Sequence, residues 1–462
     1  MMEAAQHGET REESRDESSV RRVALASSIG AAIEWYDFFI YGTAASLVFN
    51  SLFFSDLDPA TGTVVALATF AVGFLARPVG SVIFGHFGDR IGRKKMLILT
   101  LFIMGFGTFT IGLLPTYDVI GFWAPILLVL MRVFQGIGIG GEFGGAVLMA
   151  VEYAPRNRRG FYGSWPMVGV PGGLLLGSIV FALLAFMPDA AFLSWGWRIP
   201  FLLSIVLVAV GLYIRLQVLE TPAFRQVRER QEEVKVPFVT LLRTQPRELV
   251  LAMGTRWIEG LVFNAFAVLA LSYIANNLGL PRETALIGIG IAAAIGVVAI
   301  PIYGRLSDTH GRKAVYNWGV VATALLIAPA FALIQTGNTA LIWIAIAVTL
   351  GVAYAAIYAP LAAFWAELFD TKVRYTGIGS VYQFSGIFAS GLTPVIGAVL
   401  INANGGRPWL FVGYVLVVAV ISLGCAKLLP ETYRRDIFPV STREPGPGMA
   451  TGTGMSSSPV EK

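Results

Sequence analysis

Ionisable side chains inside long apolar stretches are the residues of this sequence best suited to chemistry. Glu34 and Asp37 stand three positions apart, so on a helix they share one face. Two ionised carboxylates this close repel each other, and the repulsion favours a proton on one of them. The pair therefore fits a proton carrier. The alternative is that an arginine such as Arg77 neutralises both carboxylates, which would then only hold helices together.

A second polar group follows in the apolar stretch around residue 135. Gln135 and Glu142 lie about 20° apart around a helix, and Arg132 lies about 60 to 80° away, so the three form one polar stripe. We expect this stripe to face the protein interior. Glu142 is a candidate for proton coupling, and Arg132 and Gln135 for substrate binding. A pair of Arg132 and Glu142 that only stabilises the fold is the alternative.

The second half of the chain has its own buried charge pair. Arg256 and Glu259 are again three positions apart, and Asn264 falls within about 80° of Arg256 on a helix. A guanidinium binds a carboxylate through two parallel hydrogen bonds, which suits a substrate acid. An ion pair without a ligand is the alternative. Further candidates for the substrate site, each also explicable as packing, are Arg77, Tyr354, Tyr358, Tyr382 and Gln383.

Composition says which elements carry these residues. The chain has 462 residues, of which 55% are hydrophobic and 14% charged, against about 25% charged in soluble proteins. About 20 apolar residues span a bilayer as a helix. We therefore predict an all-α integral membrane protein with twelve transmembrane helices near 23–54, 63–88, 96–114, 123–153, 160–187, 197–219, 248–275, 283–306, 314–335, 340–368, 375–402 and 408–430.

Charges between these stretches predict the topology. Most of the 34 Lys and Arg residues fall in segments that face the cytoplasm if both termini are inside, as the positive-inside rule requires. The widest polar gap splits the helices into six plus six. The predicted domains are a cytoplasmic tail at 1–22, a six-helix bundle at 23–219, a central loop at 220–247, a second bundle at 248–430 and a disordered tail at 431–462.

Several functions are excluded by composition. One Cys and three His leave no set of metal ligands, and we expect neither a metal nor another cofactor. The net charge of +5 is spread between apolar blocks instead of gathered on one face, so we expect no nucleic-acid partner. The polar segments are too short to fold as enzyme domains.

An internal repeat relates the two halves. The segment from Gly85 to Lys94 aligns with the segment from Gly304 to Lys313 at an offset of 219. The glycines of this segment permit a tight turn. A short Asp side chain at the seam between the bundles can accept hydrogen bonds from the N–H groups at a helix N-terminus, and an Arg can serve as its charge partner. The residues of the repeat that we expect to supply this turn and its charge pairs are Gly85, Asp89, Arg90, Gly92, Arg93, Asp308, Gly311 and Arg312.

The loop at 85–95 resembles the signature of the major facilitator superfamily. Within that superfamily, EWYDF at 34–38, ARPVG at 76–80 and SWGWRIP at 194–200 resemble the metabolite:proton symporters, and most of all the shikimate-permease type. The resemblance implies a bacterial inner-membrane transporter that works by alternating access, and we expect it to act as a monomer. It also implies that the residues of this loop and of its repeat form an intracellular gate, and that the protein takes up a small organic acid together with protons. A proline or betaine symporter and a proton-driven exporter are the alternatives.

Overall fold

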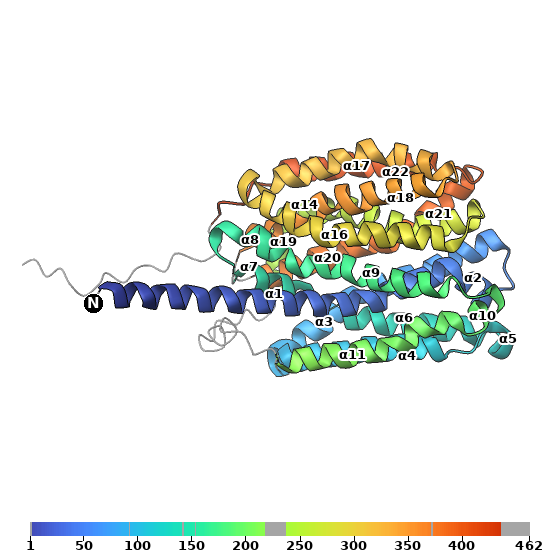
Figure 1. Cartoon of the computed structure of the whole chain (residues 1–462), viewed down its shortest axis with the longest axis horizontal. Helices are drawn as coiled ribbons and strands as arrows, with labels where there is room; N and C mark the ends of the chain where they lie inside the picture. The colour runs from blue at the N-terminus through green and yellow to red at the C-terminus, as the bar shows by residue number, and fades with distance from the viewer. Residues whose placement is uncertain are drawn as a thin grey trace, which may run out of the picture.

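The computed structural model describes residues 2–91, 93–140, 143–152, 154–217, 237–370 and 373–435. Side-chain surroundings at 2–23, 85–97 and 214–217 fall outside this description. Within the described ranges every regular element is a helix, and the long helices run roughly parallel to the long axis of the molecule (Figure 1). The predicted all-α class is confirmed.

The first half of the chain forms one group of helices. They are α1 (Met2–Leu47), α2 (Phe49–Phe53), α3 (Pro59–Ile91), α4 (Arg93–Leu113), α5 (Tyr117–Ile120), α6 (Trp123–Ile139), α7 (Phe143–Glu152), α8 (Arg159–Gly163), α9 (Trp165–Leu184), α10 (Asp189–Ser194) and α11 (Ile199–Gln217), with 3₁₀ turns η1 (Arg156–Arg158) and η2 (Gly196–Arg198). Proline begins α3, where its missing N–H leaves no hydrogen bond unmade. The short helices α2, α5 and α10 lie together at the end of the molecule that we call the outer end.

The second half forms the other group. Its helices are α13 (Pro237–Thr244), α14 (Pro246–Asn264), α15 (Ala270–Ser272), α16 (Arg282–His310), α17 (Arg312–Gln335), α18 (Thr339–Ile346), α19 (Tyr354–Leu368), α20 (Arg374–Gly386), α21 (Thr393–Ala403) and α22 (Trp409–Leu428), with π-helical segments η3 (Ala265–Leu269), η4 (Tyr273–Asn277), η5 (Ala347–Ala353) and η6 (Ile387–Gly391). Helix α13 falls within the stretch predicted as the central loop. The π-helical segments interrupt three long helices, Pro246–Asn277, Thr339–Leu368 and Arg374–Ala403, and η3 and η6 contact helices of the first half. Such segments are frequent at functional sites.

The surface and the interior have the polarity expected in a bilayer. Ten helices within the described residues are long and apolar enough to span a membrane. The remaining two predicted spans are α1 and α4, which contains a shorter apolar stretch, Ile98–Leu113. Large apolar side chains point outward, such as Phe102 (65% exposed) and Val420 (70% exposed), whereas Arg77, Arg132 and Arg256 are buried. Exposed apolar surface of this extent indicates contact with lipid, so the chain is a multi-pass membrane protein.

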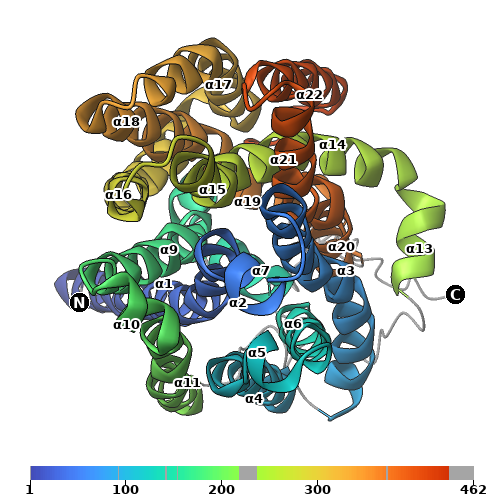
Figure 2. The ribbon, with the colours of Figure 1, turned by 90° about the vertical axis from the view of Figure 1, so that its right-hand side faces the viewer.

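The two groups of helices face each other across a seam. In the view from the outer end, helices α1 to α11 occupy the lower part and α14 to α22 the upper part (Figure 2). Helix α9 packs against α16, α3 against α20, η6 and α21, and α1 against η3 and α15. The two-bundle architecture is confirmed, while the exact domain boundaries at 219 and 248 stay a prediction. The seam is where residues from both halves meet.

Candidate functional site

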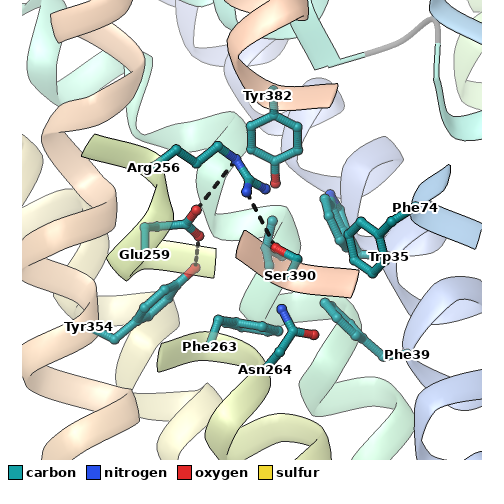
Figure 3. Close-up of a pocket in the computed structure, with 11 residues that line it drawn as sticks. Trp35, Phe39, Phe74, Arg256, Glu259, Phe263, Asn264, Tyr354, Tyr382 and Ser390 are labelled. Carbon is teal, nitrogen blue, oxygen red and sulfur yellow. Dashed lines mark hydrogen bonds and ion pairs between the residues drawn. The ribbon is translucent and has the colours of Figure 1, made fainter. Parts of the chain in front are cut away.

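A small cavity lies at the centre of the seam (Figure 3). Its lining residues come from both halves: Trp35, Phe39, Phe74 and Val170 from the first, and Arg256, Glu259, Phe263, Asn264, Tyr354, Tyr382 and Ser390 from the second. Its free volume is about 10 Å³, which is room for about one water molecule. A metabolite therefore enters only after the halves separate.

The charge pair predicted in the second half lines this cavity. Arg256 and Glu259 are almost fully buried on α14, and Arg256 Nε lies 3.5 Å from Glu259 Oε2. Neither of these two atoms has a hydrogen-bond partner among the described residues. The pair is thus held by charge without a good hydrogen bond, and both atoms stay available to a ligand. Arg256 Nη1 also donates to Ser390 Oγ at 3.3 Å.

Tyrosines from two further helices complete the surroundings of the charge pair. The Tyr354 hydroxyl donates to Glu259 Oε1 at 2.9 Å, and its ring stacks on Tyr358 with centroids 5.3 Å apart. The Arg256 guanidinium carbon lies 3.9 Å from the centre of the Tyr382 ring. Sequence reasoning proposed all three tyrosines, and the structure places Tyr354 and Tyr382 on the cavity wall and Tyr358 against Tyr354.

Two amide side chains are also brought to the seam. Asn264 Nδ2 donates to the Gly260 carbonyl at 2.8 Å, and its Oδ1 receives no donor from the described residues. Gln383 Nε2 donates across the seam to the Gly140 carbonyl at 3.1 Å. Asn264 therefore offers the cavity a free acceptor, whereas Gln383 ties the two halves together.

The polar residues of the first half form a chain inside that half. Arg132 Nη1 donates to Gln135 Oε1 at 3.0 Å, and Gln135 Nε2 donates to Thr108 Oγ1 at 2.7 Å. Asp37 is fully buried beside Thr108. No donor from the described residues meets hydrogen-bond geometry at either Asp37 oxygen. An unpaired ionised carboxylate is costly to bury, so this environment is one that a proton would relieve.

Arg77 has surroundings of a different kind. Its guanidinium carbon lies 4.1 Å from the centre of the Phe74 ring, 4.2 Å from Phe38 and 5.2 Å from Trp35. Its three guanidinium nitrogens have no acceptor in the described part of the chain. Arg77 therefore forms no ion pair with Asp37 here, although sequence reasoning had kept open that it neutralises Glu34 and Asp37. Glu34 lies nearly buried on α1, and Glu142 falls outside the described residues.

Sequence reasoning missed much of the aromatic wall. Trp35 and Phe39 stack with ring centroids 5.2 Å apart and line the cavity together. Their spacing of four positions, next to the carboxylates of α1, was a usable signal. Phe74, Phe263 and Ser390 carried no comparable signal, because only the packing of the two halves brings them to the cavity.

The end opposite the outer end, which we call the inner end, is closed by the second copy of the repeat. Asp308 Oδ1 accepts from the Gly160 N–H at 2.7 Å, and Oδ2 accepts from the Phe161 N–H at 2.9 Å. These amides belong to the first turn of α8 in the other half. Gly311 has φ 99°, a conformation that glycine adopts easily, and it lets the chain turn from α16 into α17.

Charged partners support this closure. Arg312 Nη1 lies 2.8 Å from Asp308 Oδ1, and its Nε and Nη2 bind Glu367 in a two-pronged contact at 3.1 and 2.9 Å. Arg374 pairs across the seam with Glu152 at 3.3 Å. The gate predicted at Asp308, Gly311 and Arg312 thus has a defined geometry. For the first copy, Gly92 and the side chains of Asp89, Arg90 and Arg93 lie outside the description, as do the surroundings of Gly85.

The outer end is closed by fewer polar contacts. Arg282 Nη2 on α16 lies 2.9 Å from Asp189 Oδ1 on α10. Ser46 Oγ donates to the Val268 carbonyl at 3.2 Å, and Asn276 Nδ2 donates to the Ser46 carbonyl at 3.3 Å. Polar contacts thus join the two halves at both ends of the seam.

Comparison with known proteins agrees with this architecture. A solved proton:xylose symporter, XylE bound to 6-bromo-6-deoxy-D-glucose, superposes with a TM-score of 0.72 at 18% identity, over 91% of this chain and 98% of that one. The family model "Sugar (and other) transporter" matches residues 23–237, and "Major Facilitator Superfamily" matches 252–460. The shikimate transporter of Escherichia coli is 41% identical, over 90% of this chain and 96% of its own length.

The chain belongs to the major facilitator superfamily. The resemblance drawn from the sequence motifs is therefore confirmed, and the chain is a membrane transporter and not an enzyme. A further relative, the proline/betaine transporter of Escherichia coli, is 36% identical over 91% of this chain and 86% of its own length. These relatives differ in what their names say they carry, so substrate must be argued from the cavity.

Proposed function

We propose that this major facilitator protein couples proton entry to the uptake of a small carboxylate-bearing metabolite, such as shikimate or a related hydroxylated acid. The observation that carries the proposal is the Arg256–Glu259 pair on the cavity wall, where Arg256 Nε lies 3.5 Å from Glu259 Oε2 and neither atom has a hydrogen-bond partner among the described residues. The transporter would move its substrate by alternating access across a bacterial inner membrane, with both termini in the cytoplasm.

Arg256 supplies the recognition of the acid. A guanidinium offers a carboxylate two parallel N–H donors, and a charged hydrogen bond in a dry site is about twice as strong as a neutral one. Because Arg256 already has Glu259 as a resting counter-ion, the empty site does not leave a bare charge in the membrane. A substrate carboxylate would then share or displace that contact.

Other atoms on the wall favour a hydroxylated ring. Glu259 Oε2 and Asn264 Oδ1 are acceptors without donors among the described residues, so they suit substrate hydroxyl groups. Trp35, Phe39, Phe74, Phe263 and Tyr382 supply apolar faces against which a small carbon ring packs. A hydroxylated cyclic acid would use both features.

Asp37 is the residue that we assign to the proton, with Glu34 and Glu142 as further candidates. Asp37 is fully buried on α1, beside the Arg132–Gln135–Thr108 chain, and no donor within the described residues satisfies it. Burial of a neutral carboxyl group costs far less than burial of the ion. Proton uptake at Asp37 would thus accompany closure around the substrate.

Alternating access needs two ends that open in turn. The Asp308 contacts with α8 join the halves at the inner end, and the contacts of Ser46 with Val268 and Asn276 join them at the outer end. Breaking one set while keeping the other would open the cavity to one side only. The proposal includes a monomer as the working unit, with lipid, the organic acid and protons as its partners and no cofactor.

A second candidate substrate is a zwitterion such as betaine. Aromatic rings beside a carboxylate suit a quaternary ammonium group, and here Trp35, Phe39 and Phe263 line the same cavity as Glu259. However, the Arg256 guanidinium occupies the face of Tyr382 and repels a second cation. The buried arginines therefore favour an anion over a zwitterion.

Uptake into proteoliposomes tests the proposal. The purified chain is reconstituted, the membrane potential is clamped at zero with potassium and valinomycin, and an inward proton gradient drives uptake of labelled shikimate or labelled betaine. We expect shikimate to accumulate above equilibrium and an uncoupler to abolish the accumulation. Accumulation of betaine without accumulation of shikimate would show that the substrate is a zwitterion. Accumulation of shikimate that is unchanged by the uncoupler would refute proton coupling.

A further inference from the structure

The guanidinium of Arg77 is a buried donor group to which the described part of the chain offers no hydrogen-bond acceptor. Its side chain is fully buried, and its three nitrogens lack acceptors among the residues that the structure describes. Other arginines of the membrane core differ, since Arg132 donates to Gln135 and Arg256 to Ser390. Buried polar groups are normally satisfied, and an unpaired buried charge is costly. The arrangement therefore indicates a group that meets an acceptor in another state of the transport cycle.

The surroundings of Arg77 define which acceptor suits it. The rings of Phe38 and Phe74 lie 4.2 and 4.1 Å from the guanidinium carbon. A cation over aromatic rings is stabilised without a hydrogen bond, and the guanidinium nitrogens of Arg77 meet no acceptor among the described residues. The N–H groups of a guanidinium form a planar fork that matches a carboxylate. The unused N–H groups of Arg77 are therefore suited to a planar anion.

The position of Arg77 connects it with the cavity. Trp35 and Phe74, which contact its guanidinium, also line the cavity from the first half of the chain (Figure 3). Arg77 thus lies directly behind this part of the wall. Tyr382 and Arg256, from the second half, are within electrostatic reach of it. Two guanidinium groups therefore approach the same cavity from opposite halves.

We propose that Arg77 is a second carboxylate anchor, which acts together with Arg256 once the Trp35 and Phe74 rings turn aside in an open state. The inference rests on the proposed function and deepens it. A carboxylate held by Arg77 on α3 and Arg256 on α14 bridges the two halves. The negative charge of the substrate then draws the halves together, so closure depends on that charge and a neutral analogue does not trigger it.

The test compares an acid with its neutral ester. Binding of shikimate and of methyl shikimate to the purified full-length chain is measured by tryptophan fluorescence, and the ratio of the ester Kd to the acid Kd reports recognition of the charge. In the wild type we expect a ratio of about tenfold to a hundredfold, the range for charged hydrogen bonds. Arg77→Met is expected to lower this ratio by about three- to tenfold.

Arg198→Met is the matched control. Arg198 also lies over an aromatic ring, with its guanidinium carbon 4.5 Å from the centre of Trp197, but it donates to the Gly112 and Leu114 carbonyls. Its loss is expected to lower the melting temperature and leave the ratio of the two affinities unchanged. A purely structural Arg77 would behave in the same way, because a structural defect weakens binding of the acid and the ester alike.

The outcomes separate the two claims. If Arg77→Met keeps the wild-type ratio while the wild type discriminates strongly, the second anchor is wrong and the proposed function stands. If the wild type binds acid and ester equally, or binds neither, the proposed function fails and this inference fails with it. If Arg77→Met does not fold, Arg77→Lys decides: it keeps the charge and loses the paired donors, so unchanged affinity for shikimate would overturn the anchor.

Discussion

Asp308→Asn is expected to loosen the inner end of the transporter. Asp308 accepts the Gly160 and Phe161 amides at 2.7 and 2.9 Å and pairs with Arg312 at 2.8 Å. Asparagine keeps one acceptor oxygen, but it presents an NH₂ group where the second oxygen stood and carries no charge. A hydrogen bond to a charged group contributes about 1.5 to 3 kcal/mol, and the dipole of α8 adds about 0.3 to 1 kcal/mol.

The change should therefore cost inner-closed states about 2 to 4 kcal/mol, which shifts the balance toward inward opening by about 30- to 900-fold. Ser164 supplies a reporter, because it is fully buried at the seam where α8 meets α16. With Ser164→Cys in a Cys425→Ser background, the rate of maleimide labelling measures how often this end opens. We expect Asp308→Asn to raise that rate at least tenfold.

A surface pair provides the control for that experiment. Asp370 pairs with Arg435 at 3.3 Å near the same end, but both side chains are about half exposed or more. Such pairs contribute about 0 to 1 kcal/mol, so Asp370→Asn should leave labelling of Cys at position 164 unchanged. Equal labelling rates in Asp308→Asn and in the wild type would refute the reasoning that Asp308 holds the inner end.

Three further predictions follow from the cavity and the seam. Arg256→Lys should weaken shikimate binding by about 1.5 to 3 kcal/mol, because the ammonium cannot form two parallel bonds; equal affinities by tryptophan fluorescence at matched melting temperature would make the pair structural. Asp37→Asn should abolish uphill accumulation in proteoliposomes and spare substrate exchange, since the amide mimics the protonated acid; retained accumulation would remove Asp37 from coupling. Gly391→Ala would place a Cβ 2.8 Å from Phe74 Cβ, so we expect a lower maximal uptake rate with little change in expression, and an unchanged rate would show that the seam tolerates the methyl group.

Local sequence predicted most of the fold because the length and polarity of each span are local properties. The twelve spans and the break into two halves depend only on apolar runs and on the charges between them. The repeat also predicted that an Asp at the seam accepts from a helix N-terminus, and Asp308 does so.

The cavity was less predictable because it depends on how two halves meet. Helical spacing placed Arg256, Glu259 and Asn264 near one another on one helix, and in the structure all three line the cavity. It gave no means to decide whether Arg77 neutralises Asp37, since the two stand on different helices. In the structure the Arg77 guanidinium lies over the rings of Phe38 and Phe74 instead. Ser390 reaches Arg256 from a π-helical segment, and no simple periodicity predicts such a segment.

The small free volume of the closed cavity has a consequence for inhibitors. Room for about one water molecule excludes a compound of ordinary size from this state. An inhibitor of the central site can bind only when one end is open. Its apparent affinity is the intrinsic affinity multiplied by the fraction of molecules that are open, so a small open fraction weakens binding. A variant whose inner end opens more often, such as Asp308→Asn, should therefore bind a compound selective for the inward-open state more tightly than the wild type does. Comparing the affinity of the variant with that of the wild type would then show from which side of the membrane an inhibitor acts.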